Sequence, residues 1–377
     1  MKPGMSPKET IHELLASMSR FGASDLHVKV GYKPYYRVAG HLKQIDLPPV
    51  PSTQYVEEMF REIVPAARRE EYERRGDLDF SVKGEQGDRF RVNIFRATNE
   101  MHAAIRRVQS QIPSFESLQL PKIYEETIRK THAGLILVSG VTGSGKSSTL
   151  AALLQHVNET RGEHIITIED PVEYVFQPAK SIISQREIGI DIPSYSEALR
   201  YVVRQDPDVI FIGEMRDKET MLAAIQSAET GHLVLGSVHC SDAAQTFARI
   251  LEFFSHDEHE FIRSSLSVSL GAIMCQRLLP GIEPDSRVPA TEVLLNNSTV
   301  RDKIRRGEDQ DLAAIIAQSK DEGMRNFTHS LAELIENEKI YYDIAMEYAP
   351  SREALASAVK GIKTSAQGLV GRVRGGR

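Results

Sequence analysis

The segment SGVTGSGKSST, residues 139–149, places three glycines and a lysine at the end of the apolar run GLILVSG. The spacing from Gly140 through Gly145 to Lys146 and Ser147 is G-x-x-x-x-G-K-[ST], the Walker A pattern of a phosphate-binding loop. A plain turn between a strand and a helix is the simpler interpretation, because glycines punctuate turns. A chance match is expected in only roughly one of a hundred chains of this length, so we favour the phosphate loop.

Such a loop binds a triphosphate through backbone N–H groups at a helix N-terminus, which glycines can turn inward without Cβ collisions. Lys146, in a loop expected to be solvated, would reach the β- and γ-phosphates, and the Ser147 hydroxyl would bind Mg²⁺. The expected cofactors are therefore ATP and Mg²⁺. The expected nucleotide-binding residues are Gly140, Thr142, Gly143, Ser144, Gly145, Lys146, Ser147 and Ser148.

Hydrolysis needs further groups, and carboxylates follow two later apolar segments. DVIFIGE ends in Glu214, the expected carboxylate near Mg²⁺ or its waters, because Asp208 precedes that strand. A salt bridge with Arg216 is the simpler interpretation of Glu214. TIEDPVEY supplies Glu169, which is suited to orient and deprotonate the attacking water, although its acids could instead cap a helix. The choice of base between Glu169 and Glu214 stays open.

A histidine and three arginines complete the expected catalytic set. His239 ends the segment HLVLGSVH, where it is either a γ-phosphate contact or an ordinary half-buried histidine. Arg91, Arg106 and Arg107 lie on or next to expected strands of the first 110 residues. Most arginines on strands face solvent, but the γ-phosphate otherwise lacks a positive partner, which favours an arginine finger.

The elements that must position these groups alternate between strand and helix from about residue 122. The expected strands are LILVSG, HIITIED, DVIFIGE and HLVLGSVH, and the helices include 146–157, 194–204, 218–229 and 242–254. This alternation predicts a mainly parallel sheet, whose ligands bind beyond the carboxyl ends of the strands. The Walker A loop, Glu169, Glu214 and His239 all fall at such ends. Beyond residue 260 we expect mainly helix.

The first part of the chain predicts a small, separate α/β domain. Its expected elements are a helix over 7–20, a hairpin over 25–45, a helical stretch over 53–75, and strands around the turn at 84–87 and over 101–110. The expected domains are an N-terminal domain (1–110), a proline-containing linker (111–121), an ATPase domain (122–360) and a mobile basic tail (361–377).

The composition excludes several classes of protein. The chain of 377 residues is 41% hydrophobic and 26% charged, which is typical of a soluble globular protein, and a net charge of −6 gives no argument for nucleic acid. Cys240 and Cys275 are the only cysteines, so one chain cannot build a four-cysteine zinc site. Without an apolar run of about 18 residues, we expect a cytoplasmic protein with only peripheral membrane association.

Taken together, the motifs resemble the secretion and type IV pilus ATPases, specifically PilT-type retraction motors. GASDLHV, FRVN, GVTGSGKSSTLAALL, ITIEDPVEY, DPDVIFIGEMRD, ETGHLVLGSVH and CQRLLP follow that family's order over about residues 8–350. The resemblance implies a PAS-like N-terminal α/β domain and a RecA-like P-loop NTPase core with a helical C-terminal region. It also implies a homohexamer whose nucleotides lie between the two domains, with Arg91 and Arg106 as fingers and Arg107 as an adjacent candidate.

The same resemblance implies an ATPase motor that powers type IV pilus retraction and twitching motility through domain rotation. Its implied partners are the inner-membrane platform protein of the pilus machine and a second retraction ATPase. The family's extension motors usually carry a four-cysteine zinc insertion that this chain cannot have, and IRRVQS replaces the usual FRRIPS, which leaves the register of Arg106 against Arg107 open. The alternatives are an accessory nucleotide-binding subunit and a type II secretion or pilus assembly ATPase.

Overall fold

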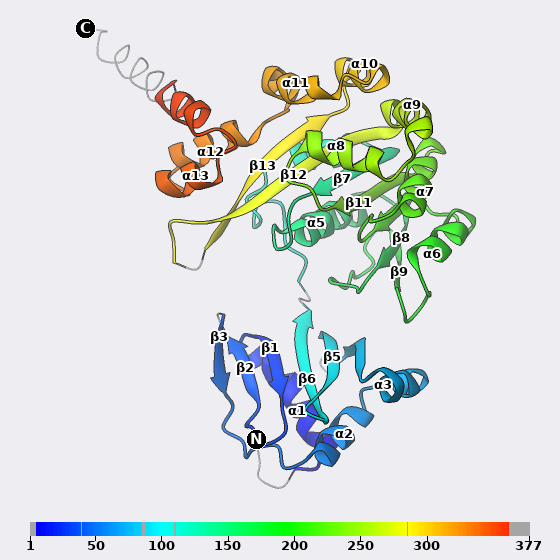
Figure 1. Ribbon diagram of the computed structural model, residues 1–377, viewed down its shortest axis with the longest axis vertical. Coiled ribbons are helices and arrows are strands. Elements are labelled where there is room, and N and C mark those ends of the chain that lie inside the picture. The colour runs from blue at the N-terminus through cyan, green and yellow to red at the C-terminus, as the bar shows by residue number, and fades with distance from the viewer. Residues whose placement is uncertain (1–4, 39, 85–87, 109–110, 285, 362–377) are drawn as a thin grey trace. The chain divides into compact units, whose positions relative to one another are not determined.

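The computed structural model describes residues 5–38, 40–84, 88–108, 111–284 and 286–361, which divide into two compact units (Figure 1). Unit 1 comprises the residues up to Ile112 together with Pro171–Val175, and unit 2 comprises the remainder. Within these ranges, no helix combines the length and the apolar character that crossing a bilayer requires. The mobile tail expected over 361–377 falls outside the described residues, apart from Gly361.

Unit 1 is built on an antiparallel sheet of six strands in the order β3-β2-β1-β6-β5-β4. The strands are β1 (Ala23–Val28), β2 (Tyr35–Val38), β3 (His41–Gln44), β4 (Asp77–Lys83), β5 (Arg89–Ala97) and β6 (Glu100–Val108). The helices are α1 (Pro7–Arg20), α2 (Thr53–Arg61), the short 3₁₀ turn η1 (Ala66–Arg68) and α3 (Arg69–Arg75). Strand residues such as Leu26 and Ile105 share one core with Leu14 of α1 and Phe60 of α2, so these helices cover one face of the sheet.

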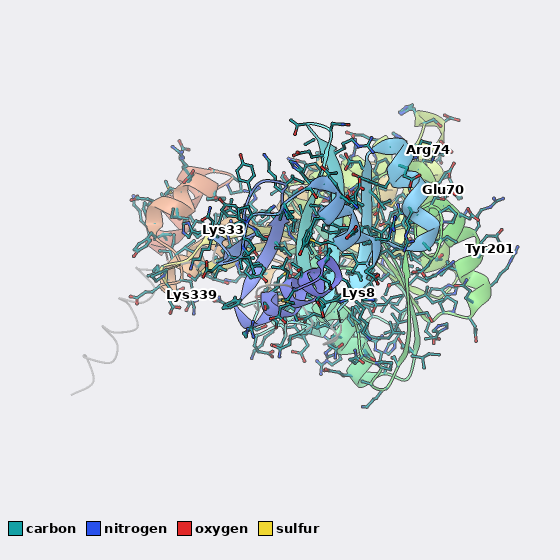
Figure 2. All side chains as sticks on the ribbon, turned by 90° about the horizontal axis from the view of Figure 1, so that it is seen from below. Lys8, Lys33, Glu70, Arg74, Tyr201 and Lys339 are labelled. Carbon is teal, nitrogen blue, oxygen red and sulfur yellow. The ribbon has the colours of Figure 1, made fainter. Side chains whose placement is uncertain are left out.

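The helix expected over 53–75 is wrong as a single element. It ends at Arg61, and the chain resumes as η1 and α3 after Pro65, which is the N-cap residue of η1. Proline has no N–H to donate to a helical bond and disfavours helical geometry in the residue before it, which separates the two helices. Figure 2 shows Glu70 and Arg74 of α3 among the side chains at the surface.

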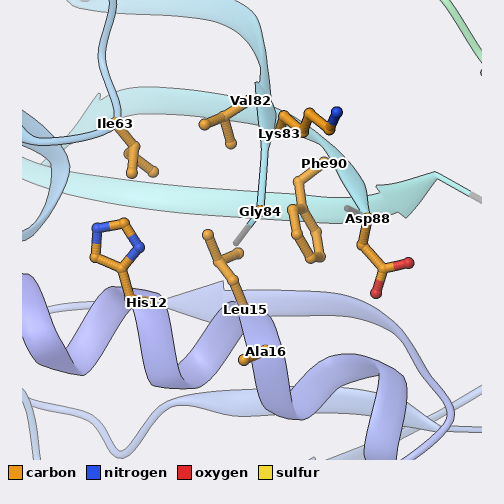
Figure 3. A pocket seen from close by; sticks show the side chains of 9 residues that line it. All are labelled: His12, Leu15, Ala16, Ile63, Val82, Lys83, Gly84, Asp88 and Phe90. Carbon is orange, nitrogen blue, oxygen red and sulfur yellow. The ribbon is translucent and has the colours of Figure 1, made fainter. Parts of the chain in front are cut away.

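A cavity of about 20 Å³ lies inside unit 1, between α1 and the β4–β5 hairpin (Figure 3). His12 and Leu15 line it from the helix, and Phe90 lines it from β5. A volume of this size holds about one water molecule. It is therefore a packing feature and is too small to bind a nucleotide.

Unit 2 contains a seven-stranded sheet in the order β13-β12-β7-β11-β10-β8-β9. Its strands are β7 (Gly134–Ser139), β8 (His164–Glu169), β9 (Ile182–Glu187), β10 (Val209–Ile212), β11 (Leu233–Val238), β12 (Leu270–Pro280) and β13 (Arg287–Leu295). Every neighbouring pair is parallel except β12 and β13. The helices are α4 (Ile123–Lys130), α5 (Lys146–Thr160), α6 (Tyr195–Val202), α7 (Lys218–Glu229), α8 (Ala243–Glu252), α9 (His259–Ser269), α10 (Ser298–Arg306), α11 (Leu312–Gln318), α12 (Phe327–Glu336), α13 (Tyr342–Tyr348) and a final helical segment over 352–361.

Helices cover both faces of this sheet, which is why its strands β7, β8, β10 and β11 are almost completely buried. Leu135 and Leu137 of β7 share a core with residues of α6, α7, α8 and α9. Ile136 and Val138, which alternate with them, are equally buried, and α5 packs on β7 and β11. In a parallel sheet covered in this way, the loops at the carboxyl ends of the strands remain available for a ligand.

The expectation of mainly helix beyond residue 260 is wrong for residues 270–295. These residues form the long antiparallel pair β12–β13, and β12 also pairs in parallel with β7. Most residues of both strands are buried, so neither shows the alternation that marks a half-exposed strand. A buried apolar run of this kind cannot be distinguished from a buried helix by its periodicity. Pairing with the rest of the sheet decides its structure.

Candidate functional site

The Walker A loop joins β7 to α5 through backbone conformations that favour glycine. Gly140, Gly143 and Gly145 have φ values of 157°, 78° and 88°. A Cβ at Gly140 would also stand 2.3 Å from Ser144 Oγ and 2.6 Å from the Gln276 carbonyl oxygen. Gly145 caps α5 and offers no side-chain hydrogen bond to the helix. The start of α5 therefore directs its first N–H groups toward the loop, which suits an anion.

Lys146 is buried rather than solvated, which corrects the expectation for this loop. Its side chain donates from Nζ to the carbonyl oxygens of Gly140, at 2.8 Å, and Val141, at 3.2 Å. Only 8% of the residue is exposed. The loop therefore holds the ammonium group against its own backbone, where a phosphate would be a stronger, charged acceptor.

The remaining loop residues fit a bound phosphate and its metal. Ser147 and Ser148 are half-buried in the first turn of α5, and Thr142 is exposed. Ser144 Oγ is buried and has no hydrogen-bond partner among the described residues. The described part of the chain contains no cluster of three or more His, Cys, Asp or Glu side chains that could hold a metal ion. Mg²⁺ commonly binds through one or two protein oxygens plus substrate phosphates and water, which the Ser147 hydroxyl and the Glu214 carboxylate suit.

Glu214 and His239, which follow the neighbouring strands β10 and β11, meet at the carboxyl edge of the sheet. His239 Nε2 lies 3.3 Å from Glu214 Oε1, while Arg216 bonds both carboxylate oxygens and donates from Nη2 to Oε2 at 2.6 Å. Burial raises the pKa of Glu214, but the hydrogen bond from Arg216 and the nearby charges of His239, Arg216 and Lys146 outweigh it and hold the pKa below its usual value. Glu214 is therefore ionised, and it forms the salt bridge with Arg216 that the simpler interpretation of this residue supposed.

Glu169 is the last residue of β8 and presents a different environment. It is 5% exposed, and its Oε1 accepts from Thr167 Oγ1 at 2.6 Å and from Gln185 Nε2 at 3.1 Å. Asp208 stands at the opposite end of β10, where its carboxylate accepts from the His164 N–H at 2.8 Å. The structure therefore places Glu169 and Glu214 at the same edge as the Walker A loop, and Asp208 away from it.

Two residues at this edge were not among the site residues expected from the sequence. Tyr195, the first residue of α6, has its pKa raised by burial and by the negative charges of Asp170, Glu169 and Glu214, so its phenol lies among the carboxylates. Gln276, within the CQRLLP motif, donates from Nε2 to the Ser144 carbonyl at 2.6 Å. The motif offered a signal for Gln276, whereas an aromatic residue at a helix start offered none for Tyr195.

An open cavity of about 510 Å³ adjoins the Walker A loop within unit 2. Thr142 and Val141 line it from the loop, His239 lines it from the end of β11, and Gln245 and Arg249 line it from α8. Ligand pockets commonly have volumes of about 300–1,000 Å³. The edge therefore offers space as well as charged groups.

In unit 1, the three candidate arginines divide between the two faces of the sheet. Arg91 and Arg106 are direct partners across β5 and β6, and Arg106 is in turn the partner of Asp25 across β1 and β6. Arg106 Nε donates to Asp25 Oδ1 at 2.8 Å, although 70% of its side chain is exposed. Arg107 points to the other face because side chains alternate along a strand, and it pairs with Asp88 at 3.2 Å. Arg91 therefore shares a sheet face with Arg106 and not with Arg107. This favours Arg106 over Arg107, and the register and the finger role both stay predictions.

The fold and this edge together define a class of protein. A glycine loop with a buried lysine follows β7, and an ionised carboxylate follows β10, with β11 between the two strands. Such a loop at a helix N-terminus is built for phosphates, and the carboxylate is suited to a metal or to water. Unit 2 is a P-loop ATPase core.

Comparisons with known proteins agree with this class. The family model described as type II/IV secretion system protein matches residues 5–361. The "Type IV pilus retractation ATPase PilT" of Pseudomonas aeruginosa is 38% identical over 339 residues, which are 90% of this chain and 98% of that protein. The "Type IV pilus ATPase PilU" of the same organism is 36% identical over 92% of this chain and 91% of its own length. The chain belongs to the type II/IV secretion system protein family.

The structural comparison confirms the fold class. The crystal structure of the pilus retraction motor PilT with bound ADP is similar with a TM-score of 0.86 and 38% identity, and covers 92% of this chain and 99% of that one. The expected architecture of a PAS-like α/β domain and a RecA-like core with a helical C-terminal region is therefore correct, apart from the β12–β13 hairpin. The chain is an ATP hydrolase of the secretion-system ATPases.

Proposed function

We propose that the chain is the Mg²⁺-dependent motor ATPase that drives retraction of a type IV pilus. The observation that carries this proposal is that the matches span nearly the full length of both this chain and its relatives. PilT is matched over 98% of its length and PilU over 91%, so the likeness extends well beyond the nucleotide loop. Both units of this chain therefore have counterparts in pilus ATPases.

The site residues have distinct proposed roles. The loop backbone and Lys146 bind the phosphates, Ser147 holds Mg²⁺, and His239 contacts the γ-phosphate. When bound, ATP would supply the phosphoryl group, and Mg²⁺ would neutralise the negative charge that develops on it. The lowered pKa of Glu214 makes its carboxylate a weak proton acceptor and a good partner for a metal or its waters. This favours Glu169 as the base that orients and deprotonates water.

We further propose a cytoplasmic homohexamer that converts hydrolysis into domain rotation. Arg91 and Arg106 would complete each nucleotide site, and their shared sheet face supports their acting together. The ring would dock, as a peripheral protein, on the inner-membrane platform protein of the pilus machine, with a second retraction ATPase as a further partner and no nucleic acid.

A second candidate is an accessory motor subunit of the PilU kind. The identity to PilU, 36%, is close to the 38% identity to PilT, and the coverage of this chain is similar. Such a subunit would bind nucleotide at the same loop but contribute little hydrolysis of its own.

Deletion of the gene, with imaging of surface pili, tests the proposal. A retraction motor predicts surplus pili that no longer retract, and complementation with the wild-type gene, but not with Lys146→Ala, should restore retraction. Loss of pili would instead indicate an assembly or secretion ATPase. Retraction that continues at reduced force, or restoration by Lys146→Ala, would indicate the accessory role.

A further inference from the structure

Strand β12 places a buried glutamine directly behind the Walker A loop. Cys275 of β12 pairs with Ser139, the last residue of β7, so Gln276 stands beside the first loop residue. Its carbonyl oxygen and Ser144 Oγ together leave no room for a Cβ at Gly140. The residue is 2% exposed, and its side chain lies inside the protein.

The side-chain amide of Gln276 bridges the loop to the helix that follows it. Its Nε2 donates to the Ser144 carbonyl at 2.6 Å, and its Oε1 accepts from Thr149 Oγ1 at 2.9 Å. A carbonyl can only accept, so Ser144 must face the amide nitrogen, and the Thr149 hydroxyl must donate to the oxygen. The orientation of the amide is therefore set by its two partners. Both bonds are buried, where an unpaired polar group is costly.

These bonds decide which way one peptide of the loop points. In a planar trans peptide the C=O and the N–H point in opposite directions. Because Gln276 holds the Ser144 carbonyl toward β12, the Gly145 N–H is directed away from β12. Gly145 has a φ of 88° and no side chain to restrict it, so the local sequence alone leaves this peptide free to rotate.

We propose that Gln276 is a positioning residue for nucleotide binding, which presets the Gly145 N–H toward the phosphate. The proposal rests on the proposed role of the Walker A loop. Gln276 makes no contact with the nucleotide in this scheme, and it acts by removing the entropy that ordering the peptide would otherwise cost on binding. Thr149 in turn holds the amide in place.

The test is calorimetric titration of the full-length chain with Mg²⁺-ADP. Gln276→Met keeps the length of the side chain and removes both hydrogen bonds, and we expect about tenfold weaker binding. The matched control is Asn296→Leu, a buried amide whose Nδ2 donates to the carbonyls of Ser267 and Leu270, beside the start of β12 rather than its loop end. It should unfold at a lower temperature but bind ADP within about twofold of wild type.

A pair of variants at Thr149 separates positioning from folding. Thr149→Val removes the anchor of the amide and should weaken ADP binding severalfold, whereas Thr149→Ser keeps the hydroxyl and should restore most of it. If Gln276→Met does not fold, this pair decides the question. The proposal is overturned if Gln276→Met binds as wild type, if Asn296→Leu loses as much affinity, or if Thr149→Val and Thr149→Ser bind equally well.

Lys146→Ala in the same titration tests the role of the Walker A loop separately from the role of Gln276. Weakened binding by Lys146→Ala together with unchanged binding by Gln276→Met overturns the positioning role alone. Unchanged binding by Lys146→Ala overturns the assignment of the loop, and the role of Gln276 with it. Weakened binding by both variants supports both.

Discussion

The Walker A edge of unit 2 and the open sheet face of unit 1 both present charged side chains, but they position them in different ways. In unit 2 two of the bonds are local: Glu214 bonds Arg216 two residues away, and Lys146 bonds the loop that precedes it. In unit 1, Arg106 meets Asp25 across 81 residues, because β1 and β6 are neighbours in the sheet. The lysine and the carboxylate of the first site thus depend in part on local backbone geometry, whereas the arginine of the second depends on strand register.

The two sites also differ in how their charges are held. Only 8% of Lys146 is exposed, whereas 70% of the Arg106 side chain is exposed. Preorganised charges in a buried setting act more strongly than exposed ones. Substitutions in unit 2 should therefore have the larger effects on hydrolysis.

The largest effect is expected from Lys146→Ala. Loss of this charge near the transferring group should cost several kcal/mol of barrier, and each ~1.4 kcal/mol lowers turnover tenfold. We expect turnover to fall about a hundredfold or more in a phosphate-release assay, with far-UV circular dichroism unchanged. The fold should survive because the carbonyls of Gly140 and Val141, which accept from Lys146 Nζ, belong to the loop itself. Near-normal turnover would contradict the assignment of this loop as the phosphate-binding site.

The carboxylates at the same edge come next. Glu169→Gln and Glu214→Gln keep the shape of each side chain and remove its charge, so ATP binding should persist while hydrolysis slows by about 10²-fold or more. Asp208→Asn is the matched control, because it lies at the other end of β10 and can still accept from the His164 N–H. If both glutamine variants hydrolyse ATP normally, the catalytic carboxylate lies elsewhere.

A smaller effect is expected from the arginines of unit 1. Arg91→Ala and Arg106→Ala should each lower turnover about tenfold or more without changing the oligomeric state. Arg107→Ala should lower turnover less, because Arg107 lies on the other face with Asp88. Turnover assays alongside light scattering test this order. A larger loss from Arg107→Ala than from Arg106→Ala would show that the wrong face has been chosen.

Mixed assemblies sharpen the same comparison. Chains carrying Lys146→Ala are combined with chains carrying Arg106→Ala, and turnover is compared with that of each variant alone. Partial recovery requires the arginine of one chain to act at the loop of another. No recovery at any mixing ratio favours donation within one chain.

The smallest effect is expected on stability, where the contribution of Glu214 should change with pH. Its pKa in the folded chain lies below the ordinary value of 4.5, so its stabilising effect is complete above that pH and is lost as the pH falls further. The difference in melting temperature between wild type and Glu214→Gln should therefore be greatest near pH 7 and shrink below about pH 4.5. Arg216 is largely exposed, so the contribution should stay under about 1 kcal/mol. A difference that grows on acidification would contradict this.

Much of the fold follows from local patterns in the sequence. The helix expected over 7–20 is α1, and the four strands expected around the Walker A loop are β7, β8, β10 and β11. Each carries a clear signal, either helical spacing or an apolar run ended by a polar residue. The break at Pro65 and the β12–β13 hairpin were not predicted. The first interrupts a region of helical spacing, and the second is buried too completely to show a period.

The candidate site also divides into residues that the sequence could place and residues that it could not. The loop, Glu214 and His239 could be placed from sequence because each follows an apolar strand in one parallel sheet. Tyr195 and Gln276 could not, since their positions depend on how α6 and β12 pack against that sheet. The shared face of Arg91 and Arg106 depends on the pairing of β5 with β6, and spacing within one strand does not reveal a neighbour's register.

The three glycines of the Walker A loop also have a consequence for the unfolded chain. Glycine has the greatest backbone freedom of any residue, so ordering this loop costs more entropy than ordering an average loop. A nucleotide that binds only the folded chain offsets this cost, by about 2.7 kcal/mol at a concentration one hundred times its Kd. Cellular proteases act on the unfolded fraction. We therefore expect the lifetime of this protein in the cell to shorten when nucleotide is depleted.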